Sequence, residues 1–144
     1  MIKILVTGGA GNIASALIAK LASNPANHIV IADNLLTGER AKVPDLPNVQ
    51  FIKCDANNYN DIAPLFFANS FEYVFHFAAV VGVQRTLQNP LWVMQDIHGI
   101  EHVLNLSKNT GVRRVYYSSS SEVYGEPFEI PQNEQTTPLN SRLP

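Results

Sequence analysis

The N-terminal region holds a strand, a glycine-rich turn, a helix and a second strand, an order that few folds accommodate. The apolar run 2–7 leads into a turn that contains Gly8 and Gly11, and a helix rich in small residues is predicted to begin near Asn12. A Cβ at either glycine would keep a pyrophosphate away from the backbone, and the start of the helix offers free N–H groups to phosphates. Asp33 ends the next apolar run about 20 residues further on, where a carboxylate can hydrogen-bond a ribose. The pattern predicts a dinucleotide-binding βαβ unit.

Short apolar runs alternate with helical patterns along most of the chain. The runs predict strands at 2–7, 28–33, 49–54, 73–77 and 114–119. The patterns between them predict helices at 12–23, 60–69 and 90–109. Continuous apolar strands separated by helices are typical of a parallel sheet covered on both faces. Right-handed crossovers then give the strand order 3-2-1-4-5 of a doubly wound α/β, or Rossmann, fold.

The composition excludes several classes of protein. The 144 residues suit one domain, and 46% hydrophobic residues can build its core. A net charge of −2 with scattered Lys and Arg gives no indication of a nucleic-acid or membrane partner. No apolar run approaches the roughly 18 residues of a membrane span. The single cysteine, Cys54, excludes an intrachain disulfide, so we expect a cytoplasmic protein with Cys54 in its core.

Acidic residues follow the second and third predicted strands, at the edge where such sheets bind ligands. The carboxylate of Asp33 would repel a 2′-phosphate, so NAD is expected rather than NADP. Arg40, in the following loop, would reverse this preference if it turned inward; otherwise it is a solvated cation. Asp55 either accepts a hydrogen bond from an adenine amino group or forms an Asx turn or helix cap. No group of His, Cys and Asp has the spacing of a metal site.

Motifs along nearly the whole chain resemble those of the extended short-chain dehydrogenase/reductases, in particular nucleotide-sugar epimerases, dehydratases and decarboxylases. The matching segments are TGGAGNIA at 7–14, DN at 33–34, Asp55, HFAA at 76–79 and SSSSEVYG at 118–125. The resemblance implies an NAD cofactor and a nucleotide-sugar substrate. The cofactor-binding residues expected from the strand ends and from these motifs are Gly8, Gly11, Asn12, Ile13, Asp33, Asn34, Asp55, Ala56, Phe77, Ala78, Ala79 and Ser118.

The resemblance also implies which residues take part in the chemistry. In relatives, a Ser or Thr after the fifth strand hydrogen-bonds the reacting sugar oxygen, and Ser120 holds that position here. Glu122 lies two residues after Ser120 and is the best indicator of the reaction type. At positions 120–122, the dehydratases have a sequence that resembles Thr-Asp-Glu, and the decarboxylases have one that resembles Thr-Ser-Glu. The alternative is that Glu122 is a structural acid that pairs with an arginine. Four successive serines could also be a polar strand end.

Three features depart from the family pattern. Ala14 replaces the third glycine of the turn, which leaves a small residue in place. Asp96 begins a segment where relatives have Asn. The catalytic Tyr-x-x-x-Lys pair is absent from the chain, and in relatives it closely follows a segment like 140–144. We therefore expect residues 1–144 to be an incomplete NAD-binding domain, the N-terminal portion of a larger enzyme, with the catalytic pair and the substrate domain beyond the chain end.

Two further predictions concern packing. His76 lies among apolar neighbours in the fourth strand, so we expect a core histidine rather than a ligand. A helical stripe of apolar residues runs along the helix at 90–109 and consists of Trp92, Val93, Ile97, Ile100, Val103 and Leu104. Core packing explains part of this stripe, and the resemblance implies that the helix also joins a homodimer.

Three functions remain open. A UDP-sugar 4-epimerase, which oxidises a sugar hydroxyl transiently by hydride transfer to bound NAD, is the first choice. A UDP-glucuronate decarboxylase or a sugar 4,6-dehydratase of the same family is the second. A protein that senses NAD without catalysis belongs to a different class, and the residues that follow Pro144 distinguish it from an enzyme.

Overall fold

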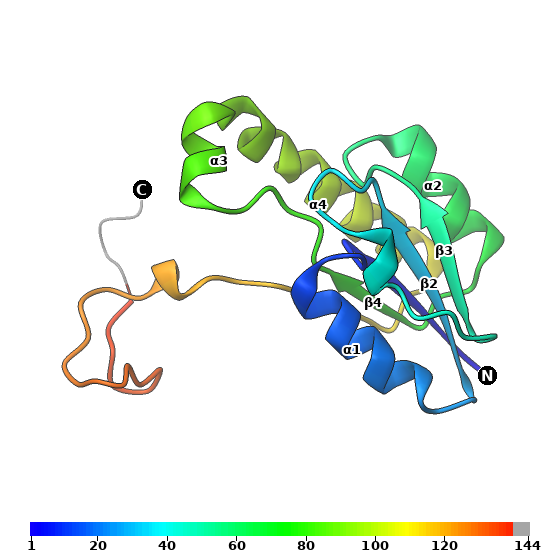
Figure 1. Cartoon of the computed structure of the whole chain (residues 1–144), viewed down its shortest axis with the longest axis horizontal. Coiled ribbons are helices and arrows are strands. Elements are labelled where there is room, and N and C mark those ends of the chain that lie inside the picture. The colour runs from blue at the N-terminus through cyan, green and yellow to red at the C-terminus, as the bar shows by residue number, and fades with distance from the viewer. Residues whose placement is uncertain (140–144) are drawn as a thin grey trace.

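Five parallel strands form one sheet in the order β3-β2-β1-β4-β5, with helices on both faces (Figure 1). The structure is a computed structural model that describes residues 1–139; the side chain of Glu122 and residues 140–144 lie outside the description. The strands are β1 (Ile2–Thr7), β2 (Asn27–Asp33), β3 (Val49–Lys53), β4 (Tyr73–His76) and β5 (Arg114–Tyr117). The doubly wound α/β fold and its strand order are confirmed.

Four α-helices and two short 3₁₀-helices connect or follow the strands. They are α1 (Asn12–Ala22), η1 (Arg40–Lys42), α2 (Tyr59–Ala68), α3 (Val83–Gln88), α4 (Pro90–Thr110) and η2 (Ser121–Val123). The bounds expected from the sequence for the predicted elements differ from these by at most two residues. Helix α3 was not predicted, because six residues are too few to show a helical period.

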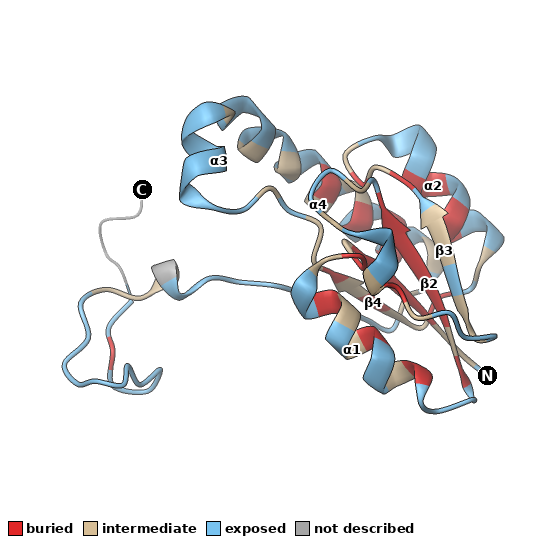
Figure 2. Ribbon diagram, viewed as in Figure 1, coloured by how far each residue is buried: buried red, intermediate tan, exposed pale blue. Residues whose placement is uncertain are grey.

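Two hydrophobic layers hold the sheet between its helices, because successive side chains of a strand point to opposite faces. Leu5 of β1 and Val74 of β4 pack with α2 and the C-terminal half of α4. Val6 and Ile31, on the other face, pack against Ile18 of α1. The buried residues, red in Figure 2, follow the central strands and the inner sides of the helices. Each such side chain contributes about 1.5–3 kcal/mol to stability.

Helix α4 extends beyond the sheet and is packed along part of its length (Figure 1). Val103 and Leu106, near its C-terminal end, are buried against the core. Leu91, Met94 and Ile97, near its start, are 70%, 71% and 64% exposed. Of the apolar stripe predicted for this helix, Val103 is buried, Val93 and Ile100 are half-buried, and Trp92, Ile97 and Leu104 are exposed.

The chain leaves the sheet after β5 and runs out into an irregular segment, orange to red in Figure 1. A bridge between Tyr124 and Leu139 and a hydrogen bond from Gly125 N to Pro138 O close this segment. In the described part of the chain nothing pairs with the outer side of β5, so β5 is an edge strand. No helix among the described residues is long and apolar enough to cross a membrane.

Candidate functional site

A cavity of about 760 Å³ lies at the carboxyl ends of the strands. Its wall includes every residue predicted to bind the cofactor: Gly8, Gly11, Asn12, Ile13, Asp33, Asn34, Asp55, Ala56, Phe77, Ala78, Ala79 and Ser118. The loop after β2 also lines the cavity, through Leu36, Thr37, Gly38 and Glu39. The sequence missed wall residues that come from η1, from the loop after β3 and from α4: Lys42, Asn57, Trp92, Gln95 and Asp96. The fold thus brings residues from all parts of the domain to one hollow.

The glycine turn lies directly against the end of β4. Gly8 has a φ of 68°, and a Cβ there would lie 2.6 Å from the backbone nitrogen of Ala78. Gly11 is the N-cap residue of α1, and within residues 1–139 no side chain caps this helix and no acid lies in its first turn. Its first N–H groups and dipole are therefore available to an anion. Ala14, in place of the third glycine, is 1% exposed and fits the close packing of α1 on the sheet.

Asp33 ties the glycine turn to the loop that follows β2. Its Oδ2 accepts a hydrogen bond from Ala10 N at 2.9 Å, and its Oδ1 accepts one from Leu35 N at 2.7 Å. Glu39 N in turn donates to Ala10 O at 3.0 Å. A Cβ at Gly38 would lie 2.9 Å from the carboxylate of Asp33. These contacts fix the acid at the wall of the cavity while its residue is 7% exposed.

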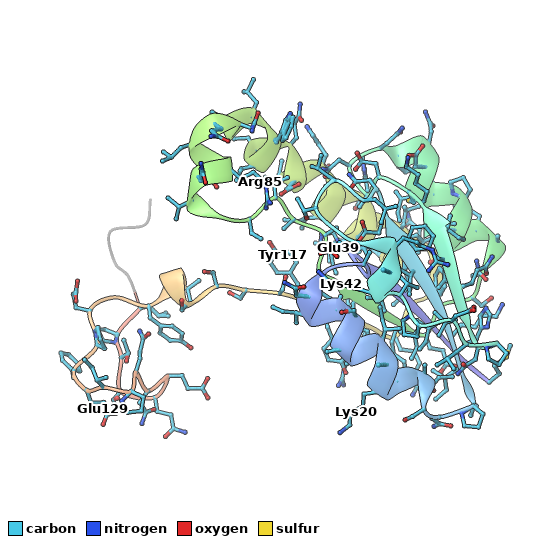
Figure 3. The ribbon with its side chains drawn as sticks, viewed as in Figure 1. Lys20, Glu39, Lys42, Arg85, Tyr117 and Glu129 are labelled. Carbon is cyan, nitrogen blue, oxygen red and sulfur yellow. The ribbon has the colours of Figure 1, made fainter. Side chains whose placement is uncertain are left out.

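The basic residues of this loop take two different positions. The guanidinium of Arg40 lies over the ring of Phe51, 4.8 Å from its centroid, and Arg40 is not in the described wall. Lys42 is in the wall, and its Nζ lies 2.5 Å from Glu39 Oε1. Figure 3 shows Glu39 and Lys42 side by side. Arg40 therefore does not turn inward, and the cation nearest the cavity on this side is already paired.

Asp55 forms the turn that the sequence left open as an alternative. Its Oδ1 accepts a hydrogen bond from Asn57 N at 2.9 Å, while Asn58 caps α2 through Asn60 N. Cys54 beside it is buried, as predicted, and burial together with Asp61 and Asp55 raises the pKa of its thiol to about 12. The turn explains the position of Asp55, which also lines the cavity.

A polar network joins α4 to two loops of the cavity. Asp96 Oδ2 accepts a hydrogen bond from Val80 N at 2.5 Å, and Asp96 Oδ1 accepts one from Asn57 Nδ2 at 3.1 Å. Asn57 Oδ1 accepts from Gly99 N at 2.9 Å, and a Cβ at Gly99 would lie 2.6 Å from that oxygen. Asp96 is thus held firmly at the wall. The sequence could not show these contacts, because the partners are 16 to 42 positions apart.

His76 is a core histidine, as expected. It is 2% exposed, and Thr7 Oγ1 lies 2.7 Å from its Nδ1. Its ring stacks on that of Tyr117 with centroids 5.8 Å apart. Burial lowers its pKa, an effect that the charge of Asp96 opposes. Its Nε2 has no hydrogen-bond partner among the described residues, so the neutral form is favoured.

The residues after β5 reach the cavity in part. Ser118 and Ser119 line it, and Ser118 Oγ donates to His76 O at 3.3 Å. Ser120 is exposed and lies outside the described wall. The side chain of Glu122 is outside the described residues, and so is the segment 140–144. The structure therefore places the start of the serine run at the site and leaves the roles of Ser120 and Glu122 as predictions.

The valines that follow β4 reach the cavity in part. Val80 and Val81 line the cavity, whereas Val83 belongs to α3, is 79% exposed and is not in the described wall. Arg85, labelled in Figure 3, lines the cavity and donates from Nη1 to Val81 O at 2.9 Å. This side of the cavity thus combines an apolar surface with one exposed cation.

The arrangement suits a ligand that is anionic at its centre and carries hydroxyl groups at one end. The glycine turn and the start of α1 can hold phosphates. The carboxylate of Asp33 can accept a hydrogen bond from a sugar hydroxyl. Residues 1–139 contain no group of three or more His, Cys, Asp or Glu placed to hold a metal ion. The residues present fit a dinucleotide.

Comparisons with known proteins agree with this geometry. The model of the NAD dependent epimerase/dehydratase family matches residues 4–144. The chain is 35% identical to a putative UDP-arabinose 4-epimerase 2 of Arabidopsis thaliana and 34% identical to UDP-glucuronic acid decarboxylase 6 of the same plant, over 95% and 92% of its length. It also superposes on the UDP-glucose 4-epimerase of Thermus thermophilus, solved in complex with NAD, with a TM-score of 0.84, 28% identity and 96% coverage.

The chain spans much less than the full length of these relatives. It covers 35% of the arabinose epimerase, 37% of the decarboxylase and 44% of the Thermus chain.

Proposed function

Because the chain belongs to the NAD dependent epimerase/dehydratase family, we propose that it binds NAD and forms the cofactor-binding part of a nucleotide-sugar 4-epimerase. The observation that carries the proposal is the cavity, whose wall joins the glycine turn, Asp33 and Ser118. Relatives named as UDP-sugar 4-epimerases, which are 30–35% identical, support the choice of reaction.

The cofactor would lie across the ends of the strands, where the strand order reverses between β1 and β4. Gly8 and Gly11 would let its phosphates approach the backbone at the start of α1. Asp33 would accept hydrogen bonds from its ribose and would repel a 2′-phosphate. Bound NAD supplies a hydride acceptor, and Val80 and Val81 would exclude water from the neighbouring space.

The sugar chemistry would need residues that follow the Rossmann strands. Ser120 would hydrogen-bond the reacting sugar oxygen, since a hydroxyl can donate to an alkoxide and accept from an alcohol. We expect a Tyr-x-x-x-Lys pair after residue 144, where the tyrosine would take the hydroxyl proton, and a substrate domain further on. Glu122 would lie near the substrate.

A decarboxylase is the second candidate. Its support is the 34% identity to a UDP-glucuronic acid decarboxylase and the Ser121-Glu122 sequence. A dehydratase is less well supported, because its mechanism needs an acid at position 121 to protonate the leaving hydroxyl, and Ser121 is a poor acid at neutral pH. A protein that binds NAD without catalysis is the third candidate.

The whole protein is proposed to be a cytoplasmic homodimer. The exposed start of α4 offers Leu91, Met94 and Ile97 as an apolar surface for the same helix of a second copy. The buried, reduced Cys54 is compatible with a reducing compartment. Light scattering would test the dimer, with Met94→Glu expected to give monomers and Phe67→Glu on α2 as the matched control.

The activity is tested with the protein encoded when the gene is read beyond codon 144. UDP-galactose and UDP-glucuronate are offered separately, with NAD⁺ present. Conversion of UDP-galactose to UDP-glucose without release of CO₂ supports the epimerase. Release of CO₂ from UDP-glucuronate favours the decarboxylase. An open reading frame without Tyr-x-x-x-Lys, together with NAD⁺ binding and no turnover, would establish the non-catalytic alternative.

A further inference from the structure

A fixed carboxylate stands between the loop that follows β4 and the loop that follows β3. Asp96 projects from α4, and its two oxygens accept hydrogen bonds from Val80 N and Asn57 Nδ2. The residue is partly buried and belongs to the cavity wall. Two donors hold the charge in one place, so it cannot swing away into solvent as a free surface acid could.

The strand order assigns this carboxylate to one half of a bound dinucleotide. Asp33 ends β2, whereas Val80 follows β4, and β1 with the glycine turn lies between the two strands. If the ribose next to adenine lies at Asp33 and the phosphates at the turn, the other half must extend toward β4 and α4. This step rests on the proposed function. It brings the nicotinamide half to the wall that contains Asp96.

The other charged groups of the wall do not neutralise the negative charge of Asp96. Asp33 ends β2, Glu39 and Lys42 follow β2, and Asp55 follows β3, all on the adenosine side. On the β4 and α4 side, the described wall has one other ionic group, Arg85, which is exposed and already donates to Val81 O. His76 of β4 interacts electrostatically with Asp96, but burial lowers its pKa, so its imidazole is neutral near pH 7. A partly buried charge is screened less by salt and water than an exposed one.

We propose that Asp96 selects the oxidised form of the cofactor, so that the protein binds NAD⁺ more tightly, relative to NADH, than it would with the usual Asn at this position. The nicotinamide ring carries a positive charge in NAD⁺ and none in NADH. When a hydride, with its two electrons, passes from a sugar carbon to the ring, the sugar alcohol becomes a ketone and its hydroxyl proton goes to a phenolic base. A nearby carboxylate stabilises the charged form and leaves the neutral form unaffected.

A preference for NAD⁺ over NADH affects a reaction in which the hydride must go to the cofactor and return. An epimerase has to return the hydride to the sugar before the ketone escapes. An acid that stabilises NAD⁺ favours this return and disfavours a trapped NADH complex. Asp96 would then be a specificity-determining residue of the cofactor site rather than a proton carrier.

The test is the ratio of the two affinities, measured on the purified protein. NAD⁺ is titrated by calorimetry and NADH by its fluorescence, for the wild type and for Asp96→Asn. We expect the preference for NAD⁺ over NADH to fall by about three- to tenfold in Asp96→Asn, as loss of one partly screened charge implies. A tenfold change corresponds to about 30 mV in the potential of the bound two-electron couple. Asp96→Glu keeps the charge and is expected to keep most of the wild-type ratio.

Two control variants separate position from net charge. Asp55→Asn removes a carboxylate from the adenosine side and is expected to change both affinities by the same factor. Asp45→Asn removes an exposed carboxylate outside the described wall and is expected to change neither. An unchanged ratio in Asp96→Asn, or an equal change of the ratio in Asp55→Asn, overturns the inference while NAD⁺ binding itself persists. If the wild type binds neither form, the proposed function fails instead, and the inference fails with it.

Discussion

Asp33 and Ala10 are joined across the glycine turn by a hydrogen bond of 2.9 Å from the Ala10 N–H to the Asp33 carboxylate. The same acid accepts the N–H of Leu35 at 2.7 Å. Ala10 is fully buried, so its N–H group has no access to water. Asp33 therefore shapes the turn as well as presenting a charge to the cavity, and its substitution should affect stability and ligand selection together.

The first prediction concerns cofactor choice. We expect the wild type to bind NAD⁺ more tightly than NADP⁺, because the Asp33 carboxylate opposes a 2′-phosphate. Asp33→Ala should narrow the gap, and it should lower the free energy of unfolding by about 2 kcal/mol or more because two backbone N–H groups lose their acceptor. Calorimetric titrations and urea unfolding measure the two effects. Equal affinity of the wild type for both cofactors would contradict the role of Asp33.

A second prediction separates close packing from backbone strain at the glycine turn. Gly8→Ala adds a Cβ 2.6 Å from Ala78 N at a φ of 68°. Gly111→Ala meets a similar φ of 77°, yet in the described part of the chain nothing lies within 4 Å of its Cβ. The strain alone costs about 1–2 kcal/mol. We expect Gly111→Ala to show that loss in urea unfolding and Gly8→Ala to lose clearly more; equal losses would refute the tight contact with β4.

The third prediction uses the raised pKa of the Cys54 thiol, about 12. The thiol should stay protonated in the folded protein up to about pH 11, so a thiol-specific disulfide reagent at pH 8 should react after unfolding in urea and not before. The same shift makes the stability of the folded protein depend on pH. Because the folded pKa is the higher one, the contribution of Cys54 is fully present below the usual thiol pKa and is lost as pH rises toward 12. Rapid labelling of the native protein at pH 8 would show that Cys54 is not buried.

A fourth prediction addresses Ser120 in the active protein. Ser120→Ala should lower kcat by about one to three orders of magnitude, as loss of a transition-state hydrogen bond does, with little change in NAD⁺ affinity. Ser119→Ala is the matched control in the same serine run. If both variants turn over at the wild-type rate, the serine run is a polar strand end. If Ser119→Ala is the impaired one, the position of the reacting hydroxyl is one residue earlier.

Most of the fold could be predicted from the sequence because its signals are local. Each strand is a continuous apolar run, and the turn at Gly8 and Gly11 fixes how β1 enters α1. The strand order then follows from the handedness of crossovers. Helix α3 was missed because its residues, Val83–Gln88, show no buried face.

The sequence predicted those residues of the site that lie at or just after the carboxyl ends of the strands. The turn formed by Asp55 with Asn57 was one of two readings that the sequence left open, because Asp favours both local turns and ligand contacts. The contacts of Asp96 with Val80 and Asn57 could not be predicted, since they depend on how α4 packs against two loops. The same holds for Lys42, whose entry into the wall depends on the path of the loop after β2.

Calorimetric titration of the purified protein with NAD⁺, beside Gly11→Val, tests the central claim most directly. Gly11 has a φ of −79°, which any residue adopts, and its Cβ would meet Gly8 O at 3.2 Å, so the variant should fold with a slightly lower unfolding midpoint. Its side chain would nevertheless fill the place where phosphates approach the start of α1. We expect one NAD⁺ to bind per wild-type chain and none to Gly11→Val. Absence of binding to the wild type, or equal binding to the variant, would contradict the claim that this cavity is an NAD site.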